Sequence, residues 1–429
     1  MSHRFGFCAV CAPTPPVTAP APARPLGLRV FNRIGGWLRA LGVPLVSLDE
    51  AALDARARKV SGLADFGDTT FREPLRVLLD SLETEAELSM LGRVIARTDV
   101  VRLLVNRLYM ADAQRRHPEI AAAPIERPLF IVGLPRTGTT ILHELMAQDP
   151  ANRVPMTWEV MHVHPPPERA TYETDPRIAA VEKHLAGVDR LIPNFKSMHP
   201  MGARLPQECV ALTAHDFASM LFSTTHTVPS YQAWLDRADL GWVYASHRRQ
   251  LQYLQWHCPA DRWVLKSPGH LWSLDALLGE YPDARIVQTH RDPLKVVASL
   301  ASLVALLRGM ASDRIDRAAI GAEWTARLAN GLQRATDVRT RLLRDDAQVF
   351  DMHFPAFIRD EVGMVRRIYT HFGMQLSADA EARMRRFLSA NPRDKHGAHR
   401  YTLADASLDA ATERRRYAAY QQRFGIADE

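Results

Sequence analysis

The chain has 429 residues, of which 47% are hydrophobic, enough to bury one large core together with an appended subdomain. A net charge of +6 is spread along the chain, which argues against a nucleic-acid-binding protein and is compatible with an anionic ligand. Four cysteines argue against a disulfide framework, and no apolar run approaches the length of a membrane-spanning helix.

The first residues are expected to lie outside the fold. Residues 1–25 are rich in alanine and proline and lack the apolar core of a secretory signal, so we expect a disordered tail and a cytoplasmic protein. Cys8 and Cys11 form a C-x-x-C pair in this tail. Because no second pair or histidine cluster completes a zinc site, we expect no metal.

Residues 26–42 carry an amphipathic pattern. Apolar residues recur there at helical spacing with arginines between them: Val30, Phe31, Ile34, Trp37, Leu38 and Leu41, with Arg29, Arg33 and Arg39. The pattern fits a helix packed on the protein's own core, or an interfacial helix in peripheral contact with a membrane. Gly35 and Gly36 weaken a free-standing helix, so we favour the packed helix.

The rest of the N-terminal region is predicted to be helical. Between residues 47 and 119 the pattern is mostly that of helices, with Val101, Leu104, Val105 and Leu108 on one apolar face. We therefore expect a helical N-terminal subdomain over residues 26–120. A short alanine- and proline-rich segment links it to the next element.

The stretch from Leu129 to Gln148, LFIVGLPRTGTTILHELMAQ, predicts a strand, a loop and a helix. Its first four residues form an apolar run typical of a buried parallel strand, which Gly133 ends. A helix then begins at Thr139. Thr139 and Thr140 bring hydroxyls and free N–H groups to the positive end of the helix dipole, which predicts a phosphate-binding loop.

This loop differs from the loop of a kinase. Gly133 and Gly138 have the separation of a Gly-x-x-x-x-Gly-Lys-Ser/Thr loop, but Thr139 occupies the lysine position and Arg136 lies inside the loop. The sequence Pro-Arg-Thr-Gly-Thr-Thr resembles the 5'-phosphosulfate loop of the sulfotransferase superfamily, which binds 3'-phosphoadenosine 5'-phosphosulfate (PAPS) without a metal. The resemblance implies a nucleotide site at Arg136, Thr137, Gly138, Thr139 and Thr140. A plain glycine-containing turn is the alternative.

Two further segments are candidates for the acceptor side. Glu159 follows the loop at about the distance of a glutamate that deprotonates the acceptor hydroxyl in several Golgi-type and bacterial sulfotransferases; a salt-bridged carboxylate is the alternative. Residues 171–260 are helical and aromatic and are expected to cover an acceptor pocket. The polar or aromatic candidates for this pocket are His199, Glu208 and Trp234. A His-Pro…Pro-x-Glu-Cys segment in the same region resembles one that recurs in a large bacterial sulfotransferase group.

Aromatic residues of the same insertion bear on the acceptor. Trp234, Tyr231 and Phe222 suggest a bulky, partly apolar alcohol or phenol, although aromatic residues at such spacing are more often plain core.

A second strand-loop-helix unit begins at Trp263. Lys266, Ser267 and Pro268 follow its strand, and ligands of open α/β sheets collect at such strand ends. The unit resembles the Leu-Lys-Thr-His element of cytosolic sulfotransferases, except that Pro268 occupies the position of the catalytic histidine. Nearby His270 could replace that base, or could simply pack or cap its helix.

The third unit has a strand over residues 285–289, a His-Arg-Asp-Pro turn and a helix over 294–307. Arg291 and Ser299 are eight residues apart, so the strand end and the helix face can converge on one anion. This spacing matches the 3'-phosphate site of sulfotransferases, where arginine supplies a planar fork of donors. A plain capped turn is the alternative.

Beyond this unit we expect a helix over residues 315–344, a strand over 348–352 and a helix over 406–429. The basic segment NPRDKHGAHRYTLADASLD resembles the loop that folds over the nucleotide's 3'-phosphate in sulfotransferases. The resemblance implies a role for Lys395 and Gly397. A solvated run of charges is the alternative.

Together these features predict an α/β protein with a P-loop-like parallel sheet flanked by helices. The sulfotransferase domain would cover residues 128–405, with the helical acceptor-side insertion at 171–260. The resemblance implies metal-free transfer of a sulfuryl group from PAPS to the hydroxyl of a small or lipid-like alcohol or phenol. Glu159, His270 or His199 would take the proton, while Arg136 and Lys266 stabilise the leaving phosphate. A P-loop small-molecule kinase and a non-catalytic nucleotide-binding protein are the alternatives.

Overall fold

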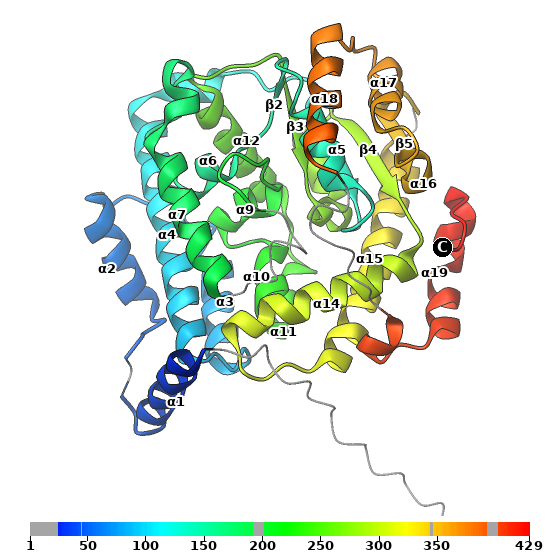
Figure 1. Ribbon diagram of the computed structural model, residues 1–429. Helices are drawn as coiled ribbons and strands as arrows, with labels where there is room; N and C mark the ends of the chain where they lie inside the picture. The colour runs from blue at the N-terminus through cyan, green and yellow to red at the C-terminus, as the bar shows by residue number, and fades with distance from the viewer. Residues whose placement is uncertain (1–24, 44, 192–200, 344–345, 393–401) are drawn as a thin grey trace, which may run out of the picture.

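A computed structural model describes residues 25–43, 45–191, 201–343, 346–392 and 402–429 (Figure 1). Three of the predictions lie outside these residues. They are the disordered tail with its C-x-x-C pair, the pocket residue His199, and the nucleotide contacts Lys395 and Gly397.

The centre of the described fold is a five-stranded parallel sheet in the order β2-β3-β1-β4-β5. The strands are β1 (Leu129–Gly133), β2 (Asn152–Arg153), β3 (Arg262–Lys266), β4 (Arg285–His290) and β5 (Val349–His353). β1 lies between β3 and β4, and Gly133 at its end pairs with Thr289. The P-loop-like parallel sheet and its four predicted strands are confirmed. The short β2 was not predicted.

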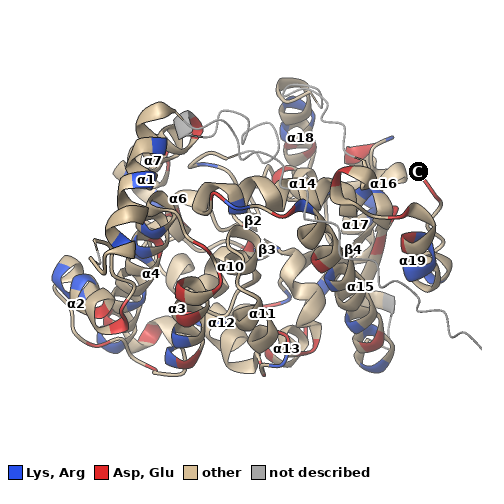
Figure 2. Ribbon diagram, turned by 90° about the horizontal axis from the view of Figure 1, so that it is seen from below, with Lys and Arg blue, Asp and Glu red and all other residues tan. Residues whose placement is uncertain are grey.

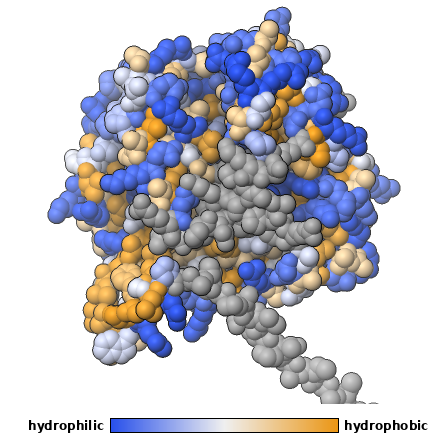
Figure 3. All heavy atoms as spheres, in the orientation of Figure 1, coloured by the Kyte–Doolittle hydropathy of each residue, from blue (hydrophilic) through white to orange (hydrophobic). Residues whose placement is uncertain are grey.

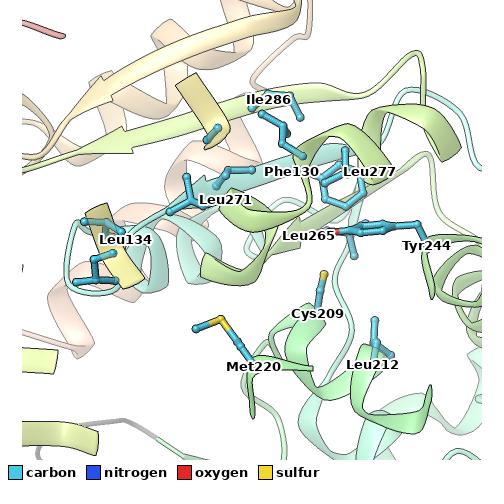
Figure 4. Packing of buried hydrophobic residues seen from close by; sticks show 14 of the residues in the cluster. Phe130, Leu134, Cys209, Leu212, Met220, Tyr244, Leu265, Leu271, Leu277 and Ile286 are labelled. Atoms are coloured by element: carbon cyan, nitrogen blue, oxygen red, sulfur yellow. The ribbon is translucent and has the colours of Figure 1, made fainter. Parts of the chain in front are cut away.

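The sheet lies between two apolar cores. Successive side chains of β1 point to opposite faces of the sheet, so this strand contributes residues to both cores. Phe130 and Val132 enter the larger core, where Phe130 packs among Leu265, Ile286 and Leu277 (Figure 4). The helices that contribute to this core include α12 (Gly241–Gln255), α13 (Leu274–Glu280), α14 (Pro293–Ala311) and α15 (Arg317–Leu342), with the short η4 (Pro268–Trp272).

The opposite face of the sheet carries the second core, to which β1 contributes Leu129 and Ile131. The helices on this side are α5 (Thr139–Met146), α16 (Phe354–Phe357), α17 (Glu361–His371) and α18 (Ala378–Ala390). η5 (Asp346–Gln348) precedes β5, and η6 (Leu403–Ala406) and α19 (Ala410–Phe424) form the end of the described chain. The predicted helices around the strands are therefore present.

The N-terminal helices and the insertion share a third apolar core. The N-terminal elements are α1 (Leu26–Ala40), α2 (Glu50–Ser61), α3 (Arg72–Thr84), α4 (Met90–Arg116) and η1 (Pro118–Ala122). The short α6 (Thr157–Met161) and η2 (Arg169–Thr174) precede the helices of the insertion, which are α7 (Pro176–Leu191), α9 (Cys209–Thr213), η3 (Ala214–Asp216), α10 (Met220–Thr225), α11 (Pro229–Leu235) and α12. Leu75 and Leu104 pack in one cluster with Phe217, Phe222 and Tyr231. The domain boundaries remain a prediction, but Phe222 and Tyr231 lie in this core.

The preferred interpretation of residues 26–42 was wrong. α1 forms, but its apolar side chains face solvent: Leu26 is 72% exposed and Trp37 64%. The buried residues of the helix are Asn32 and Gly35. A small, polar inner face lets α1 lie close to α4, and the apolar stripe is left on the outside.

α14 corrects the expectation that no segment approaches a membrane span. Its length and composition would suffice to cross a bilayer, but 67% of its apolar window is buried inside the fold. It packs against α15, α10 and α4, so its apolar character is that of a core helix.

Seen from below, acidic and basic residues are interspersed over the helices (Figure 2).

Candidate functional site

The loop between β1 and α5 is held against β4. A Cβ atom on Gly133 would lie 2.0 Å from Thr289 Oγ1, so the two strand ends can approach this closely only with glycine here. The Thr137 hydroxyl donates to Leu134 O at 2.6 Å, and its oxygen lies 2.5 Å from Thr289 Oγ1. The side chain of Thr137 therefore fixes the loop.

The N-terminus of α5 opens toward this loop. Gly138 precedes the helix with φ +90°, and a Cβ atom there would lie 3.1 Å from the rings of Phe354 and Phe357. No side chain caps this helix end in the described structure. Because the first N–H groups of a helix favour anions, Thr139 and Thr140 begin a suitable phosphate site.

Lys266 projects from the end of β3 toward the same helix end. Its side chain is 3% exposed, and Nζ lies 3.5 Å from Thr140 Oγ1. Nζ also donates to the Glu208 carboxylate, which directly precedes α9. Nearby, burial raises the pKa of Glu144, and the positive charge of Lys266 opposes this rise. The predicted strand-end lysine thus meets the N-terminus of α5, and an acidic partner joins it from the insertion.

Arg291 meets the loop from the end of β4. Its Nη1 donates to the carbonyl oxygen of Arg136 at 2.9 Å, and its guanidinium lies 4.1 Å from the ring centroid of Phe354. Nε and Nη2 donate to the Glu429 carboxylate. Ser299 lies on α14 and is 8% exposed. The structure therefore places Arg291 directly on the loop between β1 and α5. Its partner Glu429 was not predicted from the sequence.

Glu159 lies in a buried ion pair. Its carboxylate is fully buried, accepts from two nitrogens of Arg153 and also accepts from the backbone N–H of Met156 at 2.8 Å. Burial opposes the charge on Arg153, but Glu159 raises the pKa of Arg153 above its usual value. This geometry is that of the salt-bridged alternative.

His270 is buried beside a pocket. Its Nδ1 lies 2.7 Å from the Tyr244 hydroxyl, and its ring meets Phe130 edge to face. Burial lowers the pKa of His270 well below its usual value, so the ring is neutral. Nε2 of His270 is buried and has no hydrogen-bond partner among the described residues.

The pocket lies between η4 and the insertion. Apolar residues of its lining include Val210, Met220, Leu235 and Val243, and its polar and charged residues include His270, Gln232, Asp236 and Arg327. Cys209 and Ser267 also line it, and these two residues are the chain neighbours of Glu208 and Lys266. The pocket therefore adjoins the buried pair. Trp234 does not line it; its indole nitrogen donates to Glu73 at 3.0 Å.

Residues 128–379 match the model of a family described as the sulfotransferase family. The chain belongs to the sulfotransferase family. This sulfotransferase is similar to the crystal structure of sulfotransferase STF1 from Mycobacterium tuberculosis, with 35% identity and a TM-score of 0.76. That match covers 87% of this chain and 99% of the other.

Two further relatives extend the comparison. Sulfotransferase STF9 from Mycobacterium avium is 30% identical with a TM-score of 0.81, and the match covers 89% of this sulfotransferase and 98% of that chain. An omega-hydroxy-beta-dihydromenaquinone-9 sulfotransferase of Mycobacterium tuberculosis is 25% identical over 299 residues, or 66% of this chain and 71% of the relative. The family predicted from the three strand-loop units is confirmed.

Proposed function

We propose that this sulfotransferase transfers the sulfuryl group of PAPS to the hydroxyl of a lipid-like alcohol or phenol. The observation that carries the proposal is the meeting of three strand ends at one loop. Arg291 touches the loop at Arg136, and Lys266 reaches Thr140 at the start of α5. These groups suit a nucleotide with anions at both ends of its ribose.

The residues divide between the two ends of this nucleotide. Arg136, the N-terminus of α5 and Lys266 would bind the 5'-phosphosulfate, while Arg291 and Ser299 would bind the 3'-phosphate. Thr137 would act through loop geometry, because its hydroxyl is already bonded within the fold. Lys395 and Gly397 remain predicted contacts of the 3'-phosphate.

The chemistry proposed for the site is in-line attack of the acceptor oxygen on sulfur. The bond from sulfur to the phosphate oxygen breaks as the new bond from sulfur to the acceptor oxygen forms. Negative charge then grows on the phosphate, where Lys266 and Arg136 stabilise it. The acceptor hydroxyl must lose its proton, so a base is needed beside Lys266.

We assign that base to Glu208. Its carboxylate contacts Lys266 Nζ and adjoins the apolar pocket, whereas both oxygens of Glu159 are held in a buried pair. His270 is neutral and lines the pocket, so its buried Nε2 suits a hydrogen bond to the acceptor. His199 remains a candidate from the sequence.

The acceptor class rests on the pocket and on one relative. The apolar part of the lining suits a hydrocarbon body, and the polar residues beside it suit a hydroxyl. The 25% identical relative is named for a hydroxylated menaquinone, a lipid alcohol. Together, these two observations support a lipid-like acceptor for this chain. The cytoplasmic location remains a prediction.

Nucleotide binding is tested by calorimetry with adenosine 3',5'-bisphosphate and adenosine 5'-monophosphate. The variant Arg291→Ala should lower the affinity for the bisphosphate by about 10- to 100-fold and leave the affinity for the monophosphate unchanged. The reason is that charge-assisted hydrogen bonds contribute about 1.5–3 kcal/mol. Arg383→Ala removes an exposed arginine of α18 and is the matched control. Equal losses for both nucleotides, or none, would contradict the assignment.

The base is tested with Glu208→Gln, which keeps an oxygen that can accept from Lys266. We expect kcat to fall by about 10²- to 10⁴-fold while the KM for the donor changes little. Sulfuryl transfer should persist in EDTA, whereas loss of activity would favour the kinase alternative. Binding of the bisphosphate without transfer to any alcohol would favour the non-catalytic alternative.

A further inference from the structure

The outer face of α1 is a continuous apolar stripe. Leu26, Val30, Ile34, Trp37 and Leu41 follow one another at intervals of three or four residues, and each is exposed. Phe31 flanks this stripe, and Val43 and Leu45 continue the exposed apolar surface beyond the helix. The hydrophobic area at the lower left of Figure 3 lies where Figure 1 shows α1.

The inner face of α1 prevents the stripe from turning inward. Asn32 Nδ2 donates to Asp313 at 3.2 Å, and Asn32 Oδ1 accepts from the backbone N–H of Leu91 at 3.0 Å. A Cβ atom on Gly35 would lie 2.5 Å from the side chain of Met90, so the helix fits closely against α4. These contacts fix the rotation of α1 with its polar side inward.

The charged residues of the α1 segment itself are all of one sign. Residues 26–45 contain Arg29, Arg33 and Arg39 and no acidic residue. Arg39 pairs with Glu83, while Arg29 and Arg33 are exposed on the helix. Each residue turns the helix by about 100°, which places Arg29 and Arg33 along one edge of the stripe. An apolar face that carries an aromatic residue and is bordered by arginine is typical of a helix lying in the plane of a membrane interface.

We propose that α1 docks this sulfotransferase on an anionic lipid bilayer. The apolar stripe enters the boundary between headgroups and acyl chains, and Arg29 and Arg33 contact acidic headgroups. A protein partner or a second copy of the chain would also cover apolar area, but the basic border is complementary to an acidic lipid surface. The inference goes beyond the proposed chemistry and does not depend on the identity of the donor.

Co-sedimentation with vesicles tests the proposal on the full chain. Vesicles of phosphatidylcholine with phosphatidylglycerol should bind the protein, and vesicles of phosphatidylcholine alone should bind it more weakly. The double variant Ile34→Asp, Trp37→Asp should lower the partition coefficient by at least about 10-fold, because it removes apolar area and adds negative charge. Leu342→Asp is the matched control, because it changes an exposed leucine on α15.

Two readouts separate docking from folding and from chemistry. The double variant should keep its circular dichroism spectrum and its transfer to a short, water-soluble alcohol, even though it no longer binds vesicles. If the native chain did not bind anionic vesicles, the proposal would be overturned. So would self-association of the native protein that the double variant abolishes without any effect on vesicle binding, since the stripe would then be a dimer interface.

Discussion

Replacing Gly133 with alanine tests whether β1 and β4 must touch for the loop to bind phosphate. The new Cβ atom would lie 2.0 Å from Thr289 Oγ1, so the strand ends must separate by about 1 Å to reach a tolerable contact. That movement also breaks the contact between the hydroxyls of Thr137 and Thr289. Overpacking costs about 1–3 kcal/mol and a lost buried hydrogen bond about 1 kcal/mol, so we expect a loss of about 2–4 kcal/mol.

The assay pairs urea unfolding with calorimetry. The free energy of unfolding should fall by the stated amount, and the affinity for adenosine 3',5'-bisphosphate by at least about 10-fold, because a displacement of 1 Å disrupts a preorganised site. Adding Thr289→Ala should restore part of the stability, since it removes the clashing oxygen. Gly279→Ala is the control, because a Cβ on this glycine of α13 meets nothing within 4 Å. Native stability together with native affinity in Gly133→Ala would refute the reasoning.

Further predictions concern the nucleotide arginine, the buried ion pair and acid stability. Glu429→Gln should raise the affinity for the bisphosphate up to about fivefold in calorimetry, because it weakens a partly exposed partner that competes for Arg291. Glu159→Ala should cost about 3–5 kcal/mol in urea unfolding, since it leaves Arg153 buried and unpaired; a native midpoint would contradict this. Stability should fall as the pH drops below about 6.5, by up to about 1.4 kcal/mol per pH unit for each buried neutral histidine, because the unfolded chain takes up protons that the fold excludes. Burial lowers the pKa to about 3 or about 4 in four of them: His143, His215, His226 and His247. Unfolding curves that coincide at pH 7 and pH 5 would count against this last prediction.

The units around β1, β3 and β4 could be predicted because their signals are local. Each is a short apolar run followed by a polar turn and a helix, and the strand and helix on either side of Arg291 form as β4 and α14. The two-residue β2 could not be predicted, because its pairing with β3, more than 100 residues away, defines it as a strand. A pairing partner so distant leaves no trace in a short window of sequence.

The choice of the proposed base likewise depends on contacts between residues that are distant along the chain. Glu159 and Glu208 are both single glutamates in polar segments, and the sequence favoured the one at the expected distance from the loop. In the fold, Arg153 holds Glu159 while Glu208 meets Lys266 across 58 positions. The choice between them depends on side-chain packing among α9, β3 and the phosphate loop.

The sequence by itself determined the parallel sheet, the loop between β1 and α5 and the family, because these follow from local periodicity and from motifs of fixed spacing. Only the tertiary structure decided which way α1 faces. An amphipathic pattern is the same whether its apolar stripe packs on a core or points to solvent, and the orientation follows from what Asn32 and Gly35 contact. Tertiary packing likewise decided which acidic groups meet Lys266 and Arg291, since such contacts join residues that are distant along the chain.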